Sequence, residues 1–342
     1  MDAKRILLGL AASVLVLGAC APGGAQEDGD GGGGAPADAD KVTLTLNWVP
    51  YGEHAPFYHG VAQGFYADEG IDLEIKPGNG SGTTIQAVAQ DQTTFGWADT
   101  PPLLKGIAAG MPVKSVGVFL QKGPASLEFL SDQKITSPAD LKGKTVGGTP
   151  GDAMYATFPA WLKANGLSAS DVTVVNMDAA NKIAQLAEGQ VDAIMGFFHD
   201  QGPTIEARTG KQVDYLLYAD SGLNMLGTGI VASEQTLSDK ADLVSRFVRA
   251  TQKSWAEAVK DIPAAAQAMA DNAENEPPLE VLIQQLELAE PLLQLDSVGA
   301  PGVNTEQQWA DTIELMSQYA ELENAGEPSA YWDGSHAGGS GS

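Results

Sequence analysis

The sequence predicts an α/β protein with two lobes, each a mainly parallel sheet flanked by helices. From Lys41 onward, short apolar runs alternate with helical patterns, which is typical of α/β units with parallel strands. The chain has 342 residues, of which 43% are hydrophobic, enough for two lobes with sizeable cores. One helix-turn-strand pattern also occurs twice, at residues 85–99 and 183–197.

The strands are predicted from short apolar runs bounded by turn residues. They are 42–47, 71–76, 94–98, 114–119, 145–148, 172–176, 191–196 and 213–218. Helices are predicted where apolar residues recur at helical spacing. They are 55–66, 82–91, 100–109, 152–165, 179–188, 200–209, a long helix from about 243 to 259, 263–274, 277–290 and 305–320. Ser137 and Pro138 predict one further short helix, as N-cap and first-turn residue.

The repeated pattern aligns without gaps at an offset of 98 residues, as IQAVAQDQTTFGWAD and IAQLAEGQVDAIMGF. Helix-turn-strand units share such patterns in general, so the match alone leaves two interpretations open. The stronger one is that two lobes share one plan and present their strand ends to a common cleft. Open α/β sheets bind ligands beyond the carboxyl ends of their strands, and clefts between lobes are favoured pockets.

The predicted lobe boundaries follow from where the chain crosses between lobes, near 120–130 and 219–229. Lobe 1 is predicted to comprise residues 41–125 plus 225–330, and lobe 2 residues 126–224. The two crossings would form a hinge that lets the lobes close on a ligand. Residues 331–342 are predicted to form a disordered tail.

The N-terminus predicts export and a lipid anchor. Residues 1–19 have a basic start, an apolar stretch and small residues, the pattern of a signal peptide. Leu17-Gly18-Ala19-Cys20 resembles a bacterial lipobox, which implies lipidation of Cys20; the alternative is an ordinary signal followed by a chance cysteine. The rest of the segment 20–40 is rich in Gly, Ala, Pro and Asp and predicts a flexible linker. We therefore expect an extracytoplasmic protein, in the periplasm or at the cell surface, anchored to a membrane.

Composition excludes several classes of function. The formal net charge of −25 argues against binding nucleic acid or an anionic lipid surface. Cys20 is the single cysteine, which leaves the folded body without disulfides, thiolate metal sites or a cysteine nucleophile. The sequence has no Gly-x-Ser-x-Gly elbow and no His spacing typical of a metal site. We therefore expect no enzyme activity, no cofactor and no metal.

Aromatic and polar residues follow the first predicted strand, where side chains meet the cleft. Asn47, Trp48, Tyr51, His54 and Tyr58 are predicted to bind the ligand. Trp48 and Tyr51 would stack on a flat ring, although Trp48 can alternatively be a core residue. His54 either bonds a ring nitrogen of the ligand or caps the following helix, and Tyr58 lies one turn beyond it on the same face.

Two further stretches of lobe 1 reach the same cleft. Gly80, Ser81 and Gly82 precede a helix and offer backbone N–H groups to a ligand, without the pattern of a Walker loop; glycine as a turn former is the alternative. Trp97 and Asp99 end the next strand. Asp99 can alternatively cap the helix that begins at Thr100.

Lobe 2 and the second crossing contribute six more predicted site residues: Asp152, Tyr155, Phe197, Phe198, His199 and Asn224. Asp152 can alternatively be a helix cap. Glu53 and Asp200 are further acids that we expect at the cleft. The arginines of the mature chain, by contrast, all lie inside predicted helices away from strand ends: Arg208, Arg246 and Arg249.

This inventory of rings and acids indicates the chemistry of the ligand. Carboxylates and sulfonates are usually held by bidentate arginine, and no arginine is placed to do so. An aminopyrimidine presents a flat face and N–H donors, which rings and acids can bind. Backbone N–H groups can still bind an anion, so anionic ligands remain an alternative.

The chain resembles the solute-binding proteins of ABC importers in the NMT1/THI5-like group, over roughly residues 41–325. The resemblance rests on LNWVPYGEHAPFYHGVAQGFYADEGIDLEI, GSGTTIQAVAQDQTTFGWADTPPLLKGIAAGMPVKSV, ITSPADLKGKTVGG and LAEGQVDAIMGFF. It implies a type II periplasmic binding protein fold. It also implies a lipid-anchored, monomeric binding protein that delivers a thiamine pyrimidine precursor, such as formylaminopyrimidine or hydroxymethylpyrimidine, to an ABC permease.

The resemblance leaves two alternatives. One is an importer component for nitrate, sulfonate, taurine or an aromatic acid, because the DLKGK and GQVDA pieces are shared with such binders. The other is pyrimidine synthesis, because the group includes a fungal enzyme that consumes its own histidine, and His54 falls at that position. That enzyme has a cysteine-rich run in the crossing segment, where this chain reads LNMLGTGIVAS without cysteine. The departure favours binding.

Overall fold

The computed structural model describes residues 38–338 apart from 321 and 324. The predicted signal peptide at 1–19, the lipidation of Cys20 and nearly all of the linker 20–40 lie outside the described residues. Within the part that is described, no helix is both long enough and apolar enough to span a membrane.

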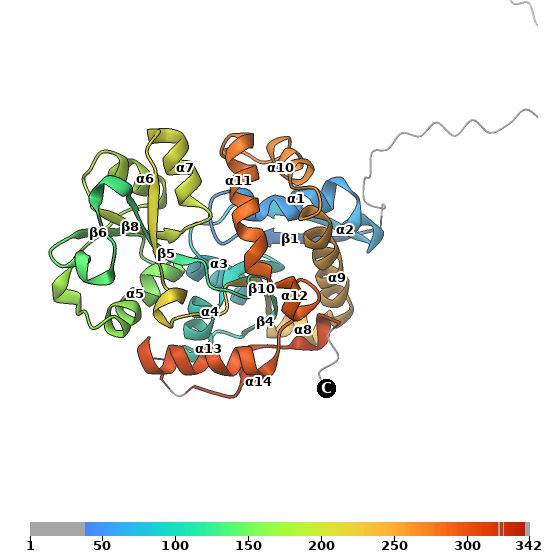
Figure 1. Ribbon diagram of the computed structural model, residues 1–342. Helices are drawn as coiled ribbons and strands as arrows, with labels where there is room; N and C mark the ends of the chain where they lie inside the picture. The colour runs from blue at the N-terminus through green and yellow to red at the C-terminus, as the bar shows by residue number, and fades with distance from the viewer. Residues whose placement is uncertain (1–37, 321, 324, 339–342) are drawn as a thin grey trace, which may run out of the picture. The chain divides into compact units, whose positions relative to one another are not determined.

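Two five-stranded sheets form the centres of the two lobes (Figure 1). The sheet of the first lobe has the order β2-β1-β3-β10-β4. Its strands are β1 (Asp40–Thr45), β2 (Ile71–Lys76), β3 (Phe95–Asp99), β4 (Val113–Val118) and β10 (Thr228–Ser233). The sheet of the second lobe has the order β7-β6-β8-β5-β9. Its strands are β5 (Ala125–Leu130), β6 (Thr145–Gly148), β7 (Thr173–Asn176), β8 (Ala193–Phe197) and β9 (Val213–Leu217).

Both sheets follow one plan. The first three strands of each order pair in parallel, and the fourth, β10 or β5, pairs antiparallel with both neighbours. In each lobe this antiparallel strand is the one that arrives from the other lobe along the chain. The predicted two-lobed α/β fold with mainly parallel sheets is confirmed.

The repeated sequence pattern occupies the same place in both lobes. Residues 85–99 lie in α3 (Ser81–Ala89) and β3, and residues 183–197 lie in α6 (Ala179–Ala187) and β8. β3 and β8 are each the third strand of their sheet order. Their carboxyl ends therefore occupy equivalent positions in the two lobes.

Most of the remaining helices match the predicted positions, whereas the short helices at 234–239, 295–298 and 328–331 were not predicted. The remaining helices are α1 (Ala55–Ala62), α2 (Phe65–Asp68), α4 (Thr100–Ala108), α5 (Ala153–Ala164), α7 (Gln201–Thr209), α8 (Glu234–Asp239), α9 (Ala241–Ala258), α10 (Ile262–Ala270), α11 (Leu279–Ala289), α12 (Leu295–Val298), α13 (Glu306–Tyr319) and α14 (Pro328–Tyr331). A 3-10 turn follows Ser137 as predicted, with Ser137 at its N-cap. The predicted helix 55–66 is instead broken into α1 and α2, because Gly64 between them has a φ of 74°, a conformation that glycine adopts readily.

The strand β5 lies within the segment near 120–130 that the sequence predicted to be a crossing between the lobes. β5 begins at Ala125, directly after Gly123 and Pro124, which end the first crossing. The crossings themselves are residues 119–124 and 218–227, and they run side by side. The Gly227 N–H donates to the Leu120 carbonyl at 2.9 Å, and the Gly123 N–H donates to Asn224 Oδ1 at 3.2 Å.

The C-terminal segment departs from the prediction of a disordered tail. Tyr331 is buried, and Trp332 forms a β-bridge with Ser115 of the first lobe. The ring of Trp332 also stacks on Trp309 of α13, with the ring centroids 6.0 Å apart. The aromatic pair at 331–332 thus supplies apolar surface that the fold buries. The many Gly and Ser residues around this pair led to the prediction of disorder. The prediction is wrong for 331–338, whereas 339–342 lie outside the described residues. The exact lobe boundaries stay a prediction.

Candidate ligand-binding site

A small enclosed cavity lies between the two lobes, beyond the ends of β1, β3 and β8. Five residues from each lobe line it: Asn47, Trp48, Tyr51, Ser81 and Asp99 from the first, and Asp152, Met154, Phe197, Asp200 and Gln201 from the second. The volume of about 20 Å³ is enough for one water molecule. Binding a heterocycle here therefore requires the lobes to separate or the lining side chains to move.

Most of the lining was predicted from the sequence. Seven of the predicted ligand-binding residues meet at this cavity, and Asp200 was expected as a cleft acid. The sequence analysis missed Met154 and Gln201. Met154 carries no signal that separates it from a core residue. Gln201 is the first residue of α7 and follows Asp200 directly, so its position after a strand end was the available clue.

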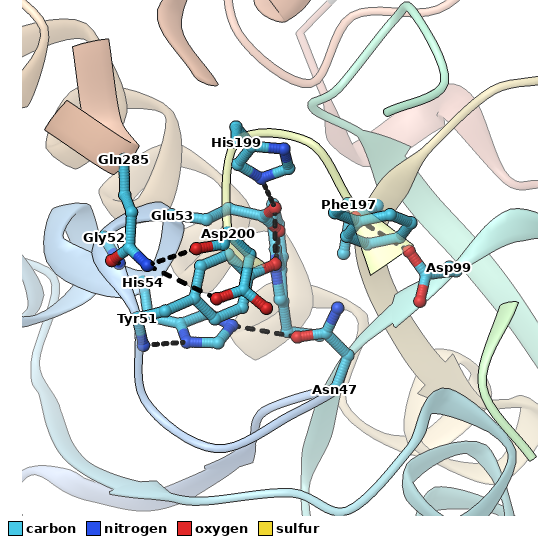
Figure 2. Close-up of polar contacts among 12 residues, drawn as sticks. Asn47, Tyr51, Gly52, Glu53, His54, Asp99, Phe197, His199, Asp200 and Gln285 are labelled. Atoms are coloured by element: carbon cyan, nitrogen blue, oxygen red, sulfur yellow. Dashed lines mark hydrogen bonds and ion pairs between the residues drawn. The ribbon is translucent and has the colours of Figure 1, made fainter. Parts of the chain in front are cut away.

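Glu53 is a fully buried carboxylate that connects the two lobes (Figure 2). It accepts hydrogen bonds at 2.7 Å from the Tyr51 hydroxyl and from the Trp97 indole N–H. His199, which follows β8 in the second lobe, donates from Nε2 to Glu53 at the same distance. Burial by itself raises the pKa of Glu53, but the hydrogen bond and charge of His199, together with His54 and the Tyr51 hydroxyl, outweigh it and hold the pKa below its usual value. His199 was predicted to contact the ligand, yet it does not line the cavity.

Trp97 also differs from its predicted place. It is fully buried in the core of the first lobe, where its ring stacks on Trp255 at 5.6 Å and meets Phe57 edge-on at 5.0 Å. Trp97 lies two residues before the end of β3, where Phe57 of α1 and Trp255 of α9 cover it, whereas Asp99 ends the strand and reaches the cavity. The prediction that Trp97 forms a wall of the cleft is therefore wrong. Its indole N–H instead positions Glu53.

The His54 side chain forms hydrogen bonds with two residues that line the cavity. Its Nδ1 accepts the Tyr51 backbone N–H at 3.3 Å, so the proton lies on Nε2, which donates to Asn47 Oδ1 at 2.9 Å. Burial lowers the pKa of His54 to about 4, which keeps the ring neutral near pH 7. His54 does not line the cavity. It caps the short turn η1 (Gly52–His54) and orients Asn47.

Gln285 of α11 forms a second polar link between the lobes (Figure 2). Its Oε1 accepts the Gly52 N–H at 2.8 Å. Its Nε2 donates to the Asp200 carbonyl at 2.8 Å and to Thr204 Oγ1 at 3.2 Å. One side chain from the outer helical layer thus holds η1 of the first lobe and the start of α7 in the second.

Three carboxylates of the cavity have raised pKa values because they are buried. Burial raises the pKa of Asp99 to about 6, although hydrogen bonds from Ser81 and Thr228 oppose the rise. Burial raises the pKa of Asp200 to about 7, against the attraction of Lys182. Burial also raises the pKa of Asp152, whose Oδ1 accepts the Tyr155 N–H at 2.6 Å. Asp152 therefore caps α5 and lines the cavity at once, and its contact with a ligand stays a prediction.

Lys182 of α6 brings a buried cation to this acidic site. Its Nζ lies 3.5 Å from Asp152 Oδ2, donates to the Met195 carbonyl at 2.8 Å and sits 4.9 Å from the centre of the Trp48 ring. A cation over an indole face is attracted by the ring electrons. Trp48 therefore contacts the second lobe through Lys182, a residue that the sequence analysis did not single out.

Other predicted site residues lie at the edges of the cavity. The Gly82 N–H donates to the Gly151 carbonyl of the second lobe at 3.3 Å, and Gly80 approaches the same carbonyl. Both glycines permit close approach of the two lobes, whose backbones meet here.

Four further predicted residues also lie outside the cavity. The Tyr155 hydroxyl donates to Asn176, Phe198 packs edge-on against Tyr215, and Asn224 links the two crossings. Tyr58 borders an open groove on the first lobe instead.

The cavity therefore combines aromatic walls with several hydrogen-bond acceptors. Trp48, Tyr51 and Phe197 supply rings, and Asp99, Asp152 and Asp200 supply carboxylates. No arginine is among the lining residues, and the described part of the chain holds no cluster of three side chains suited to a metal ion. Such a lining suits a flat molecule that donates hydrogen bonds.

The two lobes and the cleft between them have the periplasmic binding protein fold. The chain belongs to the NMT1/THI5-like family, whose model matches residues 52–266. Among solved structures, it is similar to the alkanesulfonate-binding protein SsuA from Xanthomonas axonopodis pv. citri. That comparison has a TM-score of 0.64 and 17% identity, and covers 87% of this chain and 99% of that one.

Two curated relatives are named as binding proteins. The riboflavin-binding protein RibY of Chloroflexus aurantiacus is 31% identical over 222 residues, covering 64% of this chain and 62% of RibY, less than two thirds of its length. The formylaminopyrimidine-binding protein of Halalkalibacterium halodurans is 22% identical over 321 residues, covering 93% and 94%. Further relatives, 26–28% identical, are named as 4-amino-5-hydroxymethyl-2-methylpyrimidine phosphate synthases.

The raised pKa of Asp99 predicts a pH-dependent stability. Because the folded-state pKa of about 6 exceeds the ordinary value near 4, the folded protein binds this proton more tightly than the unfolded chain. The free energy of unfolding should therefore fall as the pH rises from about 4 to about 6, by roughly 2–3 kcal/mol from this one group. The Asp99→Asn variant has no ionisable group at this position, so its free energy of unfolding should decrease less over the same pH range.

Urea unfolding of the wild type and Asp99→Asn across this pH window measures the difference. Asp72→Asn is the matched control, because Asp72 is exposed on β2. Unfolding curves of Asp99→Asn that fall in parallel with those of the wild type and the control would contradict the burial argument.

The contact between Gly82 and Gly151 predicts a variant that hinders closure. A Cβ at Gly82 would already lie 3.3 Å from the Gly151 carbonyl, so the longer side chain of Gly82→Leu should clash with the second lobe only when the lobes meet. We expect ligand affinity to drop about tenfold or more, with little change in the melting temperature. Gln86→Leu places the same side chain at an exposed position of α3 and should bind normally. Equal affinities for the two variants would show that the lobes need not meet here.

Proposed function

We propose that this protein captures a small, flat heteroaromatic molecule outside the cytoplasm and delivers it to an ABC permease. The observation that carries the proposal is that rings and acceptors from both lobes converge on one enclosed space. Trp48 and Tyr51 come from the first lobe and Phe197 from the second. Aromatic side chains favour stacked or edge-on contacts with other rings. A ligand ring bound there would contact both lobes at once.

The ligand that we propose first is a pyrimidine precursor of thiamine, such as formylaminopyrimidine or hydroxymethylpyrimidine. An aminopyrimidine donates N–H groups to carboxylates and accepts hydrogen bonds at its ring nitrogens. Asp152, Asn47 and Gln201 offer both kinds of partner. The formylaminopyrimidine-binding relative, which matches nearly the whole chain, supports this choice.

Riboflavin is the second candidate, because the relative with 31% identity is a riboflavin-binding protein. Its isoalloxazine ring is also flat, and it carries an N–H donor beside two carbonyls. Nitrate and sulfonates have less support, because the described cavity presents three carboxylates and no arginine. Anions placed among carboxylates are repelled.

Binding is favoured over pyrimidine synthesis by the state of His54. Both of its ring nitrogens are engaged within the protein, and the side chain is fully buried. The crossing segment also lacks the cysteines that the resemblance leads one to expect in the synthase. If the protein were such an enzyme, incubation with iron and pyridoxal phosphate would change its mass at His54.

Closure of the lobes is the proposed binding mechanism. The ligand would enter a more open arrangement and shift the equilibrium toward the closed one by its greater affinity for it. The crossings at 119–124 and 218–227 would serve as the hinge. The protein would act as a monomer, held at the membrane through lipidated Cys20, a residue that lies outside the described part of the chain.

Isothermal titration calorimetry with a ligand panel tests this function. The panel comprises formylaminopyrimidine, hydroxymethylpyrimidine, riboflavin, taurine and nitrate. We expect binding of at least one heteroaromatic and no heat with either anion. Trp48→Ala should weaken that binding about tenfold or more, because it removes a stacking ring worth roughly 1 kcal/mol beyond its buried area.

Phe65→Ala provides the control for this substitution. Phe65 is a partly buried ring on α2, remote from the cavity lining, and its loss should leave affinity unchanged. Binding of taurine or nitrate together with silence from every heteroaromatic would overturn the proposed function.

A further inference from the structure

Three residues of the enclosed cavity also face an open groove outside it. Trp48, Asp200 and Gln201 line both spaces. The groove, called here the outer groove, runs between residues 48–50 and 275–278 of the first lobe and residues 200–208 of the second. Its volume is about 320 Å³, against about 20 Å³ for the cavity. Trp48, Asp200 and Gln201 thus separate the small cavity from the larger outer groove.

The size of the outer groove matches that of a ligand site. Pockets for small molecules typically measure roughly 300–1,000 Å³, a range that the cavity alone does not reach. The outer groove also continues past Val49, Pro50, Arg208 and Asn275, which line a larger depression of about 1060 Å³ on the first lobe. A chain attached to a ring in the cavity would therefore have space to extend outward once Trp48, Asp200 or Gln201 moves aside.

Three polar side chains of the outer groove are available to bind a ligand. The side chains of Arg208, Asn275 and Glu276 form no hydrogen bond or ion pair with any other described residue. Arg208 and Asn275 are exposed, and Glu276 is half-buried. Together they offer guanidinium and amide donors beside carboxylate and amide acceptors. Val49, which is 44% exposed, adds an apolar surface between them.

The mixture of charges indicates the type of group that would fit. A hydroxyl both donates and accepts, so a chain of hydroxyls can use Arg208 and Glu276 at the same time. A phosphate or carboxylate would gain from Arg208 but would meet the carboxylates of Glu276 and Asp200. A purely apolar chain would leave these polar groups without partners.

We infer that the outer groove is a second subsite, which binds a neutral, hydroxyl-bearing chain attached to the heteroaromatic ring held in the cavity. This inference rests on the proposed function and, of its two candidate ligands, favours the second, a riboflavin-like ring compound with a polyhydroxylated side chain, over the pyrimidine precursors, which lack such a chain. Trp48 would then contact both parts of the ligand, the ring on one side and the start of the chain on the other.

A pair of probes separates the contributions of chain and ring. Riboflavin carries a hydroxylated chain on its ring system, and lumichrome is a related ring system without that chain. Calorimetry on the full-length protein should show riboflavin binding about tenfold or more tighter than lumichrome. Riboflavin 5′-phosphate, whose chain ends in an anion, should bind more weakly than riboflavin.

The double variant Arg208→Ala/Asn275→Gly removes two polar groups of the outer groove. Asn275 has a φ of 62°, and glycine keeps that backbone conformation without strain. We expect the variant to lose most of the difference between riboflavin and lumichrome while lumichrome affinity stays within about twofold. Arg249→Ala is the control, because Arg249 pairs with Glu69 on another face of the first lobe, and it should retain the full difference.

Four outcomes would overturn the inference. The first is equal affinity of the wild type for riboflavin and lumichrome, and the second is an unchanged difference in the double variant. The third is tighter binding of the phosphate than of riboflavin, which would show that the groove selects an anion. In the fourth, hydroxymethylpyrimidine binds but riboflavin does not, so the subsite fails while the proposed function stands. If none of these ring compounds binds, both the second subsite and the proposed function are overturned.

Discussion

The contact between the two lobes depends on one buried charged group, the carboxylate of Glu53. The Glu53 carboxylate has no access to water and receives donors from Tyr51 and Trp97 of its own lobe and from His199 of the other. Removing one partner of a buried pair commonly costs about 3–5 kcal/mol, because the remaining charge is left uncompensated. When the lobes separate, Glu53 must exchange His199 for water. The meeting of the lobes is therefore coupled to the charge of a residue that never touches the cavity.

This dependence links the core, the cleft and the outer helices. Trp97 belongs to the aromatic core of the first lobe, yet its N–H orients Glu53. Tyr51 lines the cavity and donates to the same carboxylate. Gln285 of α11 adds a parallel connection, from Gly52 beside Glu53 to Asp200 in the second lobe. A ligand that displaces Tyr51 or Asp200 would change these hydrogen bonds directly. Ligand contacts could in this way alter how the two lobes are held together.

The sequence predicted the lobes and much of the cavity because both follow from periodicity and from strand ends. β3 and β8 end at Asp99 and Phe197, and the residues at those ends meet as expected. The prediction for Trp97 failed because this residue lies two positions before the end of β3, inside the aromatic core of the first lobe. Lys182 and Gln285 lie within helices, where lysine and glutamine usually face solvent. Only their three-dimensional neighbours reveal them as buried partners of the site.

The most direct test of closure upon a ligand is a distance between spin labels on the two lobes. Gln267→Cys on α10 and Lys211→Cys beyond α7 provide exposed attachment points, and Cys20→Ser removes the single native cysteine. Pulsed electron resonance should show a shorter and narrower distance distribution after saturation with the heteroaromatic that binds in calorimetry. An identical distribution with and without that bound ligand would contradict closure as the mechanism of capture.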